Sequence, residues 1–503
     1  MRSFLRSLVL VPVMLLGACA QLQPVELPDA PVSPASNAPA WDVLDPGFAG
    51  DWHVLLNDGP TALDWRLFAI DSATETIDIQ TFLLTLDTVG AAVIDHLIAA
   101  ADRGVRVRFL IDDSFLQGED ELVMLVHQHE NMAFRVFNPY LRRGGGAITR
   151  QALNLAEFHR LDHRMHNKAM IVDGRVAIVG GRNLADEYFG LHGEANFRDL
   201  ELIVGGPVVA RIEEAFVDYW NDDWSLPIDQ LTHVTPTHVD DAMVRALAGD
   251  AAALHDERDG AARAAAWQSL MGEAVPGASR LLVDEPPDEN PALESEAPVQ
   301  VANALMDLFD SAREEVVIVS AYFIPTEALE SAIRRAEARG VSVRILTNSI
   351  RSNNHLSAHS AYRNHIAALL GFGADVYEVR ADAADRTTYI RPPVSGKVLG
   401  LHAKALIIDH DRVFIGSANL DPRSLRINTE MGLVVTSEAL NAVLREAVAP
   451  DFAAGNAWNL RYDDAGKVTW VSGDEVLTAQ PVDSAFQRLE DWFFAHLPIE
   501  DEL

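Results

Sequence analysis

Residues 166–183 read HNKAMIVDGRVAIVGGRN, and residues 402–419 read HAKALIIDHDRVFIGSAN. Both stretches place His, Lys, Asp, Gly and Asn at the same spacing: Lys follows His by two residues, Asp follows Lys by five, Gly follows Asp by seven and Asn follows Gly by three. The copies begin far apart in the chain, at His166 and at His402. A pattern of this length that is written twice predicts one site assembled from two similar halves.

Each copy has the polarity of a strand, a turn and a returning strand. Residues 166–172 and 402–408 carry apolar β-formers after a polar opening, so we expect strands there. Side chains two apart on a strand face the same side, so the His and Lys of each copy should point into one space. Asp173–Gly174 is a turn dipeptide, and residues 409–411 form a turn-like cluster at the equivalent place.

The groups that each copy gathers suit a phosphodiester. The return strand ends in a small pair, Gly180–Gly181 or Gly416–Ser417, which lets backbone N–H groups approach an anion. Asn183 and Asn419 add side-chain donors. An imidazole, an ammonium and an amide in each half supply cations and donors for phosphate oxygens, and a group that attacks or protonates.

The use of lysine supports this interpretation. The chain has four lysines and 36 arginines, yet Lys168 and Lys404 occupy the two motif positions. A compact ammonium is therefore favoured over a planar guanidinium at these places.

The duplicated motif resembles the phospholipase D superfamily, whose defining pattern is a paired His-x-Lys. Over roughly residues 41–503 the chain resembles the bacterial cardiolipin synthase C type. The segments that carry this closer likeness are Met165–Lys168, Val179–Asn183, Asp186–Gly190, Phe197–Asp199, Ser320–Phe323, Asp421–Arg423 and Asn428–Glu430. The fold that the resemblance implies is α/β, with two similar phospholipase D-like lobes that form one active site at their interface.

The resemblance also implies a two-step displacement. One histidine attacks phosphorus and forms a phosphohistidine, and the other protonates the leaving alcohol and later deprotonates the incoming alcohol or water. By analogy His166 is the nucleophile and His402 the acid–base group, although the order of the two stays open. The residues expected to hold the non-bridging oxygens are Lys168, Lys404, Asn183 and Asn419. The scheme requires no metal and no cofactor.

Two carboxylates are expected to orient the imidazoles. Asp199 and Glu430 follow the histidine of their own copy at comparable separations, where family members place a carboxylate that sets the tautomer. Asp173 and Asp409 belong to the motif, and we expect them to tie down the turns. Two further motif positions are expected to support the site: Gly181 and Ser417.

The flanking sequence predicts two lobes. A strand, a helix and a strand are expected at 76–84, 89–103 and 105–112, and again at 315–323, 326–339 and 341–347. The predicted organisation is an N-terminal phospholipase D-like lobe over 41–238, a linker region with short helices over 239–298, and a C-terminal lobe with an extension over 299–503.

The N-terminal residues resemble a bacterial lipoprotein signal. Arg2 and Arg6 precede the apolar run Leu8–Leu16, which is too short for a comfortable membrane span and leads to Cys19. We expect a signal peptide over 1–18, a lipid on Cys19, which is the only cysteine, and a Pro/Ala-rich tether over 19–40. The expected location is the periplasmic side of the cell envelope, with the outer membrane favoured.

The net charge of the chain limits the classes of binding partner that are expected. Forty basic and 74 acidic side chains give a formal charge of −34, which disfavours nucleic acid as the main partner. The expected partners are phospholipid substrates and a membrane reached through the lipid anchor. An accessory protein is left open.

Three functions are compatible with the sequence. The first is a phosphatidyltransferase that makes cardiolipin from phosphatidylglycerol and a second phospholipid. The second is a phospholipase D hydrolase that releases phosphatidic acid, and the third is a non-catalytic lipid-binding lipoprotein. The first two differ in how well the site excludes water, which motif residues do not report.

Overall fold

The structure of the protein is a computed structural model that describes residues 27–45, 47–116, 118–143, 154, 157–252, 260–287 and 299–482, with 484, 487, 490, 491 and 494. Cys19 and the predicted signal peptide lie outside the described residues. Among the residues described, no helix combines the length and the apolar character needed to cross a membrane.

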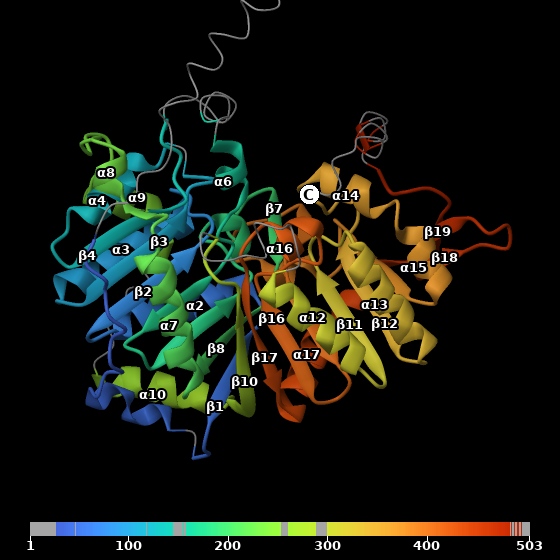
Figure 1. Cartoon of the computed structure of the whole chain (residues 1–503), viewed down its shortest axis with the longest axis horizontal. Helices are drawn as coiled ribbons and strands as arrows, with labels where there is room; N and C mark the ends of the chain where they lie inside the picture. Colours follow the sequence, from blue (N-terminus) through green and yellow to red (C-terminus); the bar gives the residue numbers. More distant parts are fainter. Residues whose placement is uncertain are drawn as a thin grey trace, which may run out of the picture.

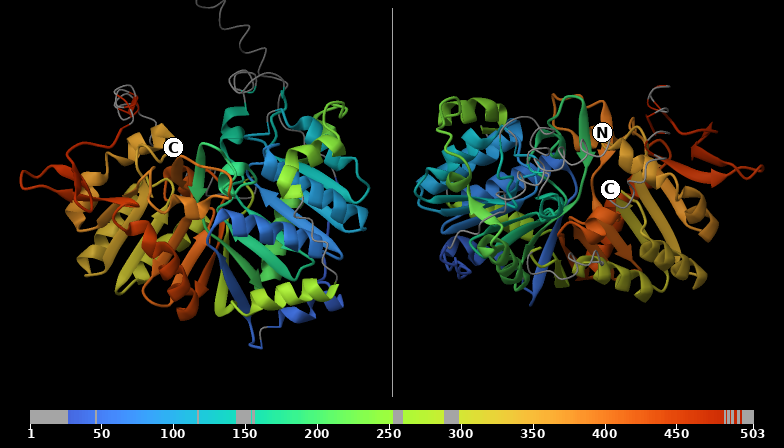
Figure 2. Two further views of the ribbon diagram at one scale, coloured as in Figure 1. Left: turned by 180° about the vertical axis from the view of Figure 1, so that it is seen from behind. Right: turned by 45° about the horizontal axis from the view of Figure 1, so that its top comes forward.

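Two α/β halves lie side by side and share one sheet (Figures 1 and 2). In the described chain this sheet has 18 strands. The first half contributes, from the outer edge inward, β9 (Ser225–Pro227), β4 (Met132–Phe137), β3 (Arg106–Asp112), β2 (Thr76–Thr81), β5 (Ala169–Val172), β6 (Val176–Gly180), β8 (Glu201–Gly205) and β1 (Asp51–Leu56). The second half continues with β10 (Val275–Val283), β17 (Met431–Thr436), β16 (Arg412–Gly416), β15 (Lys404–Ile408), β11 (Glu315–Ser320), β12 (Ser342–Asn348), β13 (Asp375–Val379), β18 (Ala457–Tyr462), β19 (Val468–Ser472) and β20 (Glu475–Leu477).

Helices cover both faces of the sheet (Figure 1). Those of the first half include α2 (Gly59–Ser72), α3 (Thr88–Asp102), α4 (Asp120–His127), α6 (Phe158–Asp162), α7 (Val208–Asn221) and α8 (Ile228–Leu231). Those of the second half include α12 (Gln300–Ser311), α13 (Glu327–Ala338), α14 (Leu356–Tyr362), α15 (Ile366–Phe372), α16 (Pro422–Arg426) and α17 (Glu438–Val448).

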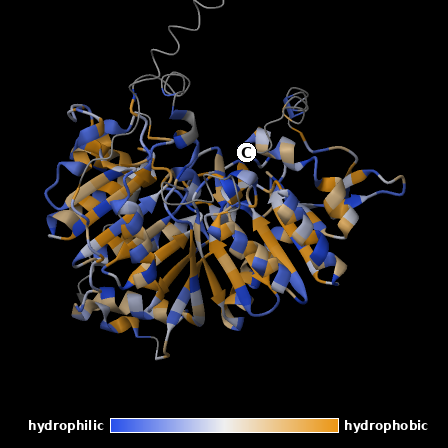
Figure 3. Ribbon diagram, viewed as in Figure 1, coloured by the Kyte–Doolittle hydropathy of each residue, from blue (hydrophilic) through white to orange (hydrophobic). Residues whose placement is uncertain are grey.

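Alternate strand residues face opposite cores. In β5, Met170 and Val172 pack with α2 and α3, whereas Ala169 and Ile171 pack with α7. The core on the α7 side also contains strand residues of the second half and α17, so the two halves share it. The strands of this shared region are strongly hydrophobic (Figure 3).

The expected strand, helix and strand of each half are confirmed. They are β2, α3 and β3 in the first half, and β11, α13 and β12 in the second. The Asp87 side chain accepts a hydrogen bond from Gly90 N and caps α3, while the Thr326 hydroxyl accepts one from Leu329 N and caps α13.

The strands expected at 166–172 and 402–408 start later than predicted. β5 begins at Ala169 and β15 at Lys404, so both histidines lie before their strands. The reason is that each histidine N–H donates to a carbonyl of the other half, Thr429 O for His166 and Arg198 O for His402.

The region predicted as a linker holds more than short helices. It contains α9 (Asp241–Ala252) and α10 (Gly260–Met271), and also the nine-residue strand β10. β10 pairs with β1 on one side and β17 on the other, and so joins the two halves into one sheet. β10 reads VPGASRLLV, and Pro276 and Gly277 near its start, which are unfavourable inside strands, conceal it in the sequence.

Candidate active site

Backbone pairing between the halves brings the two motifs together. Beside His166, the chain of the first half makes a bridge from Met165 to Thr429, with two N–H···O bonds of 2.9 Å. Beside His402, β14 (Val398–Leu401) pairs in parallel with β7 (Ala195–Arg198) of the first half. Each histidine is therefore anchored to the opposite half at the point where its side chain emerges.

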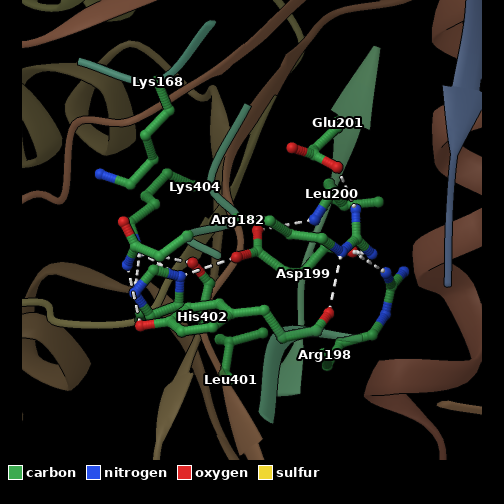
Figure 4. A network of polar contacts seen from close by, with 12 residues as sticks. Lys168, Arg182, Arg198, Asp199, Leu200, Glu201, Leu401, His402 and Lys404 are labelled. Carbon is green, nitrogen blue, oxygen red and sulfur yellow. Dashed lines mark hydrogen bonds and ion pairs between the residues drawn. The ribbon is translucent and has the colours of Figure 1, made fainter. Parts of the chain in front are cut away.

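The orienting carboxylates are exchanged between the halves. His166 Nδ1 lies 2.8 and 2.9 Å from the two carboxylate oxygens of Glu430, and His402 Nδ1 lies 2.7 Å from Asp199 Oδ2. Figure 4 shows Asp199 against His402. Asp199 and Glu430 thus orient the imidazoles as expected, each that of the opposite copy, because the backbone pairing sets Thr429 and Arg198, the neighbours of the two acids, beside the opposite histidine.

The two imidazoles are held neutral, and each is bound to its carboxylate through Nδ1. Burial lowers the pKa of His166 to about 4 and that of His402 to about 3, and lysines of both halves add to the effect. Burial opposes ionisation of Asp199, but its contact with His402 prevails and brings its pKa to about 2. An ionised carboxylate at Nδ1 keeps the ring proton there and leaves the lone pair on Nε2, and in His402 this Nε2 atom faces Lys404 Nζ.

Two buried ammonium groups flank the rings. Lys168 Nζ donates to His166 O at 2.7 Å, and Lys404 Nζ lies 3.1 and 3.2 Å from the ring nitrogens of His402. Burial lowers the pKa of Lys168 to about 7 and that of Lys404 to about 8. The charge of Lys404 also lowers the pKa of Lys168, so the cations of the two halves share one site (Figure 4).

The motif asparagines sit in the same buried region. Asn183 Nδ2 donates to the Tyr188 hydroxyl at 2.9 Å. In the described structure the Oδ1 atoms of Asn183 and Asn419 are buried without a hydrogen-bond partner. A flip of either amide, which exchanges its oxygen and nitrogen, would present an NH₂ donor at that place, as an anionic oxygen requires.

The small residues of the motif make room for the carboxylates. A Cβ atom at Gly181 would lie 2.3 Å from Asp199 Oδ1, so the absence of a side chain admits that carboxylate. At the equivalent place in the second half, the Ser417 hydroxyl donates to Glu430 Oε2. These positions therefore contact the acids, whereas the sequence suggested approach of their backbone to an anion.

The motif aspartates lie in the turns. Asp173 and Asp409 have φ of 54° and 49°, in the left-handed region. The Asp173 carboxylate accepts hydrogen bonds from three successive backbone N–H groups before and at the start of β2, residues 74–76. The Asp409 carboxylate accepts from the N–H groups of residues 313–315, which lead into β11. Each aspartate thus fastens its hairpin to the neighbouring strand of its half, β2 or β11.

A network of buried ion pairs holds the backbone of Asp199. Arg182 Nη2 donates to Asp199 O at 2.6 Å, and Arg182 Nη1 lies 3.2 Å from Glu201 Oε2. Arg66 Nη2 donates to the other Glu201 oxygen at 2.7 Å (Figure 4 shows Arg182 and Glu201). Sequence reasoning missed these residues, although Arg182 stands inside the motif, because burial of a charged residue leaves no periodic signal.

A second buried acid holds Glu430. Asp284 Oδ2 accepts a hydrogen bond from Glu430 N at 2.9 Å, and Asp284 N donates to Glu430 O at 3.0 Å. Burial raises the pKa of Asp284 well above its usual range. Asp284 directly follows β10, so the same unexpected strand brings it to the site.

Aromatic rings cover both imidazoles. The Phe82 ring centre lies 4.9 Å from that of His166, edge to face. Tyr188 lies 4.9 Å from His402 in the same manner, and Phe197 lies 5.4 Å from it. Within the described ranges, no group of three or more histidine, cysteine, aspartate or glutamate side chains is placed to hold a metal ion.

Comparisons with known proteins show which family the chain belongs to. The family model described as "Cardiolipin synthase, PLD-like domain" matches residues 67–220 and 305–451. Cardiolipin synthase C of Escherichia coli (strain K12) is 33% identical over 440 residues, covering 86% of this chain and 91% of that protein. Cardiolipin synthase A of Pseudomonas putida (strain GB-1) is 29% identical over 414 residues, covering 81% and 70% respectively.

A solved structure shares the fold. The crystal structure of phosphatidylserine synthase from Haemophilus influenzae Rd KW20 matches with a TM-score of 0.58 at 15% identity, and the match covers 90% of this chain and 95% of that one. The chain therefore belongs to the phospholipase D superfamily and, within it, to the cardiolipin synthase type.

Proposed function

We propose that the protein is a phosphatidyltransferase that makes cardiolipin from phosphatidylglycerol and a second phospholipid through a phosphohistidine intermediate. One observation carries this proposal: two neutral imidazoles, each oriented by a carboxylate of the opposite half, stand in one site with two buried lysines. This set supplies a nucleophile, a proton carrier and positive charge for a phosphodiester.

In the first step, His166 Nε2 attacks the phosphorus of the donor lipid. The N–P bond forms as the P–O bond to the headgroup alcohol breaks, and His402 Nε2 gives its proton to the leaving oxygen. The bound phosphodiester is an anion, so it raises the pKa of His402 and of both lysines, and the site takes up protons as substrate binds. The choice of His166 as nucleophile rests on the family resemblance.

In the second step, phosphatidylglycerol is the acceptor. Its free hydroxyl gives its proton to His402, its oxygen bonds to phosphorus, and the N–P bond breaks. Lys168, Lys404, Asn183 and Asn419 hold the non-bridging oxygens through both steps. His166 and His402 are 7% and 5% exposed, which limits access of water and supports an alcohol as acceptor.

The lipid products distinguish the three functions. Purified protein is incubated with labelled phosphatidylglycerol and phosphatidylethanolamine, and the lipids are separated. A diphosphatidyl product supports the transferase, phosphatidate alone indicates a hydrolase, and binding without turnover indicates a lipid-binding protein. Protein denatured during turnover with alkaline detergent should carry the phosphatidyl label, because an N–P bond survives base but not acid, and His166→Ala should lose this label. Retained labelling in that variant would contradict the choice of nucleophile.

We also propose that the protein is anchored to the periplasmic side of the envelope through a lipid on Cys19. The support is the sequence alone, because this residue lies outside the described ranges. A lipid anchor would keep the transfer site beside the bilayer that holds both substrates.

A further inference from the structure

An aromatic pair leads from the protein surface to His166. Phe82 follows β2 and is half-buried, with its ring edge to face on His166. Phe115 follows β3, and its ring centre lies 5.4 Å from that of Phe82, again edge to face. Phe115 is 51% exposed, and it is the only phenylalanine among the exposed large hydrophobic side chains of the described residues. The rings of Phe115 and Phe82 therefore form one continuous apolar surface, the aromatic step, which extends from the exposed Phe115 to the His166 imidazole.

At the two corresponding positions of the second half there is no aromatic side chain. β2 pairs with the motif strand β5 in the first half, as β11 pairs with the motif strand β15 in the second. When β5 and β15 are matched, these registers place Ala321 at the position of Phe82. β3 and β12 are separated along the sequence by the same number of residues as the two motifs. This separation places Arg351 at the position of Phe115. The duplication preserved the histidines and lysines, while the flanking aromatic pair belongs to one half alone.

The surroundings of His402 are enclosed and more polar. Tyr188 and Phe197, which contact the ring, are 5% and 7% exposed. The Tyr188 hydroxyl bonds Asn183, and nearby the Tyr322 hydroxyl donates to Asn354 at 2.6 Å. Among the described rings around the two imidazoles, the exposed apolar surface lies on the His166 side.

We propose that Phe82 and Phe115 form the subsite for the acyl-bearing glycerol of the donor lipid. This inference rests on the proposed function. Between the two steps the phosphatidyl group stays bonded to His166, while one alcohol leaves and another arrives beside His402. The apolar part of the donor must then lie next to His166, where the aromatic step is. The polar headgroup alcohols exchange on the side of the hydroxyl groups.

The test compares two soluble substrates that differ only in acyl chains. One is dihexanoyl phosphatidylglycerol below its critical micelle concentration, and the other is deacylated glycerophosphoglycerol. The readout is release of the glycerol headgroup, which transfer and hydrolysis both produce. All proteins in this test carry Cys19→Ser, so no lipid anchor requires detergent. Because no membrane or micelle is present, general attachment to a bilayer does not contribute to the rates.

Phe115→Ala in the full-length protein should lower the ratio of kcat/KM for the acylated over the deacylated substrate by about tenfold, since apolar contact with the acyl chains is lost. Phe115→Leu keeps an apolar side chain and should restore most of the ratio. Tyr462→Ala is the matched control, because Tyr462 is 46% exposed and lies on β18 at the far end of the sheet.

Two results would overturn the subsite. An unchanged ratio in Phe115→Ala would show that the chains do not contact this ring. An equal fall for both substrates would show that the aromatic pair acts by positioning His166. Lack of turnover by the unmodified protein would instead contradict the proposed function, so the two failures are distinguishable.

Discussion

Lys168 and Lys404 are cations whose charge depends on pH in the working range. Burial brings their pKa to about 7 and about 8, so the ammonium fraction of each falls as pH rises from 6 to 9. An anionic phosphodiester needs both ammonium groups, so its binding weakens in the same window. The strongest binding is therefore expected at the acidic end of that range.

We expect KM for phosphatidylglycerol to rise by about tenfold or more between pH 6.5 and pH 9, because two coupled groups lose their protons. Proton uptake on binding of a non-reactive phosphodiester should be visible in calorimetry with buffers of different ionisation enthalpy. A KM that stays constant across this range would show that the lysines remain charged in the free protein.

Gly181 and Ser417 occupy equivalent places but meet their acids differently. Gly181→Ala would set a Cβ atom 2.3 Å from Asp199 Oδ1 and force that carboxylate away from His402. We expect kcat to fall by about two orders of magnitude, as when the orienting acid of a catalytic histidine is lost. Steady-state kinetics with a circular dichroism check of folding would measure this.

Ser417→Ala is the matched control. It removes the hydroxyl that donates to Glu430 and accepts from Met431 N, and it adds no atom at the site. The expected fall in kcat is about tenfold or less. Equal effects of the two substitutions would contradict the steric account of Gly181.

The hairpins that carry the motifs are fastened by their turn aspartates. Asp173 is fully buried and accepts three backbone hydrogen bonds from the chain that enters β2, together with one from the Trp41 indole N–H. Asp173→Asn keeps the size and tolerates the left-handed φ, but one carboxylate oxygen becomes an NH₂ group that faces donors.

We expect Asp173→Asn to lower the free energy of unfolding by about 2 kcal/mol. Urea denaturation followed by tryptophan fluorescence gives this quantity. The fall in kcat/KM of the folded variant gives the loss of transition-state stabilisation. This loss should be smaller than the loss in free energy of unfolding. A larger loss in transition-state stabilisation than in unfolding free energy would assign Asp173 to the catalysed reaction. Asp409→Asn repeats the test in the second half.

The whole molecule is one sheet with a shared core. β10 joins β1 to β17, and one hydrophobic core draws side chains from both halves. The exchanged pairs His166–Glu430 and His402–Asp199 span sequence separations of 264 and 203 residues. The site exists only where the halves meet, so neither half alone holds a complete histidine–carboxylate pair.

The proposed lipid on Cys19 determines whether the whole protein is attached to a membrane. Cys19→Ser should move the protein from the membrane fraction to the soluble periplasmic fraction, because no lipid can be attached to serine through a thioether. Purified variant should turn over phosphatidylglycerol in detergent micelles at the rate of a detergent-solubilised unmodified sample. Continued sedimentation with membranes after a salt wash would contradict anchoring by this residue.

Much of the protein could be predicted from its sequence. The spacing of His, Lys and Asn indicated a phosphodiester site in two halves, and strand–helix alternation indicated the α/β lobes. These predictions succeeded because the side-chain period of a strand and the apolar face of a helix are local properties. The grouping of an imidazole, an ammonium and an amide in each half was likewise visible, since it depends on residue type and short spacing.

Tertiary structure alone decided which carboxylate serves which histidine, what Gly181 makes room for, and that β10 joins the halves. The same holds for the pairing of Phe115 with Phe82 beside His166. Each of these depends on backbone pairing or packing between segments far apart in the chain, such as β7 with β14 and Met165 with Thr429. Local periodicity sets which face of a strand a side chain occupies, but the neighbour across that face is chosen by long-range hydrogen bonding and burial.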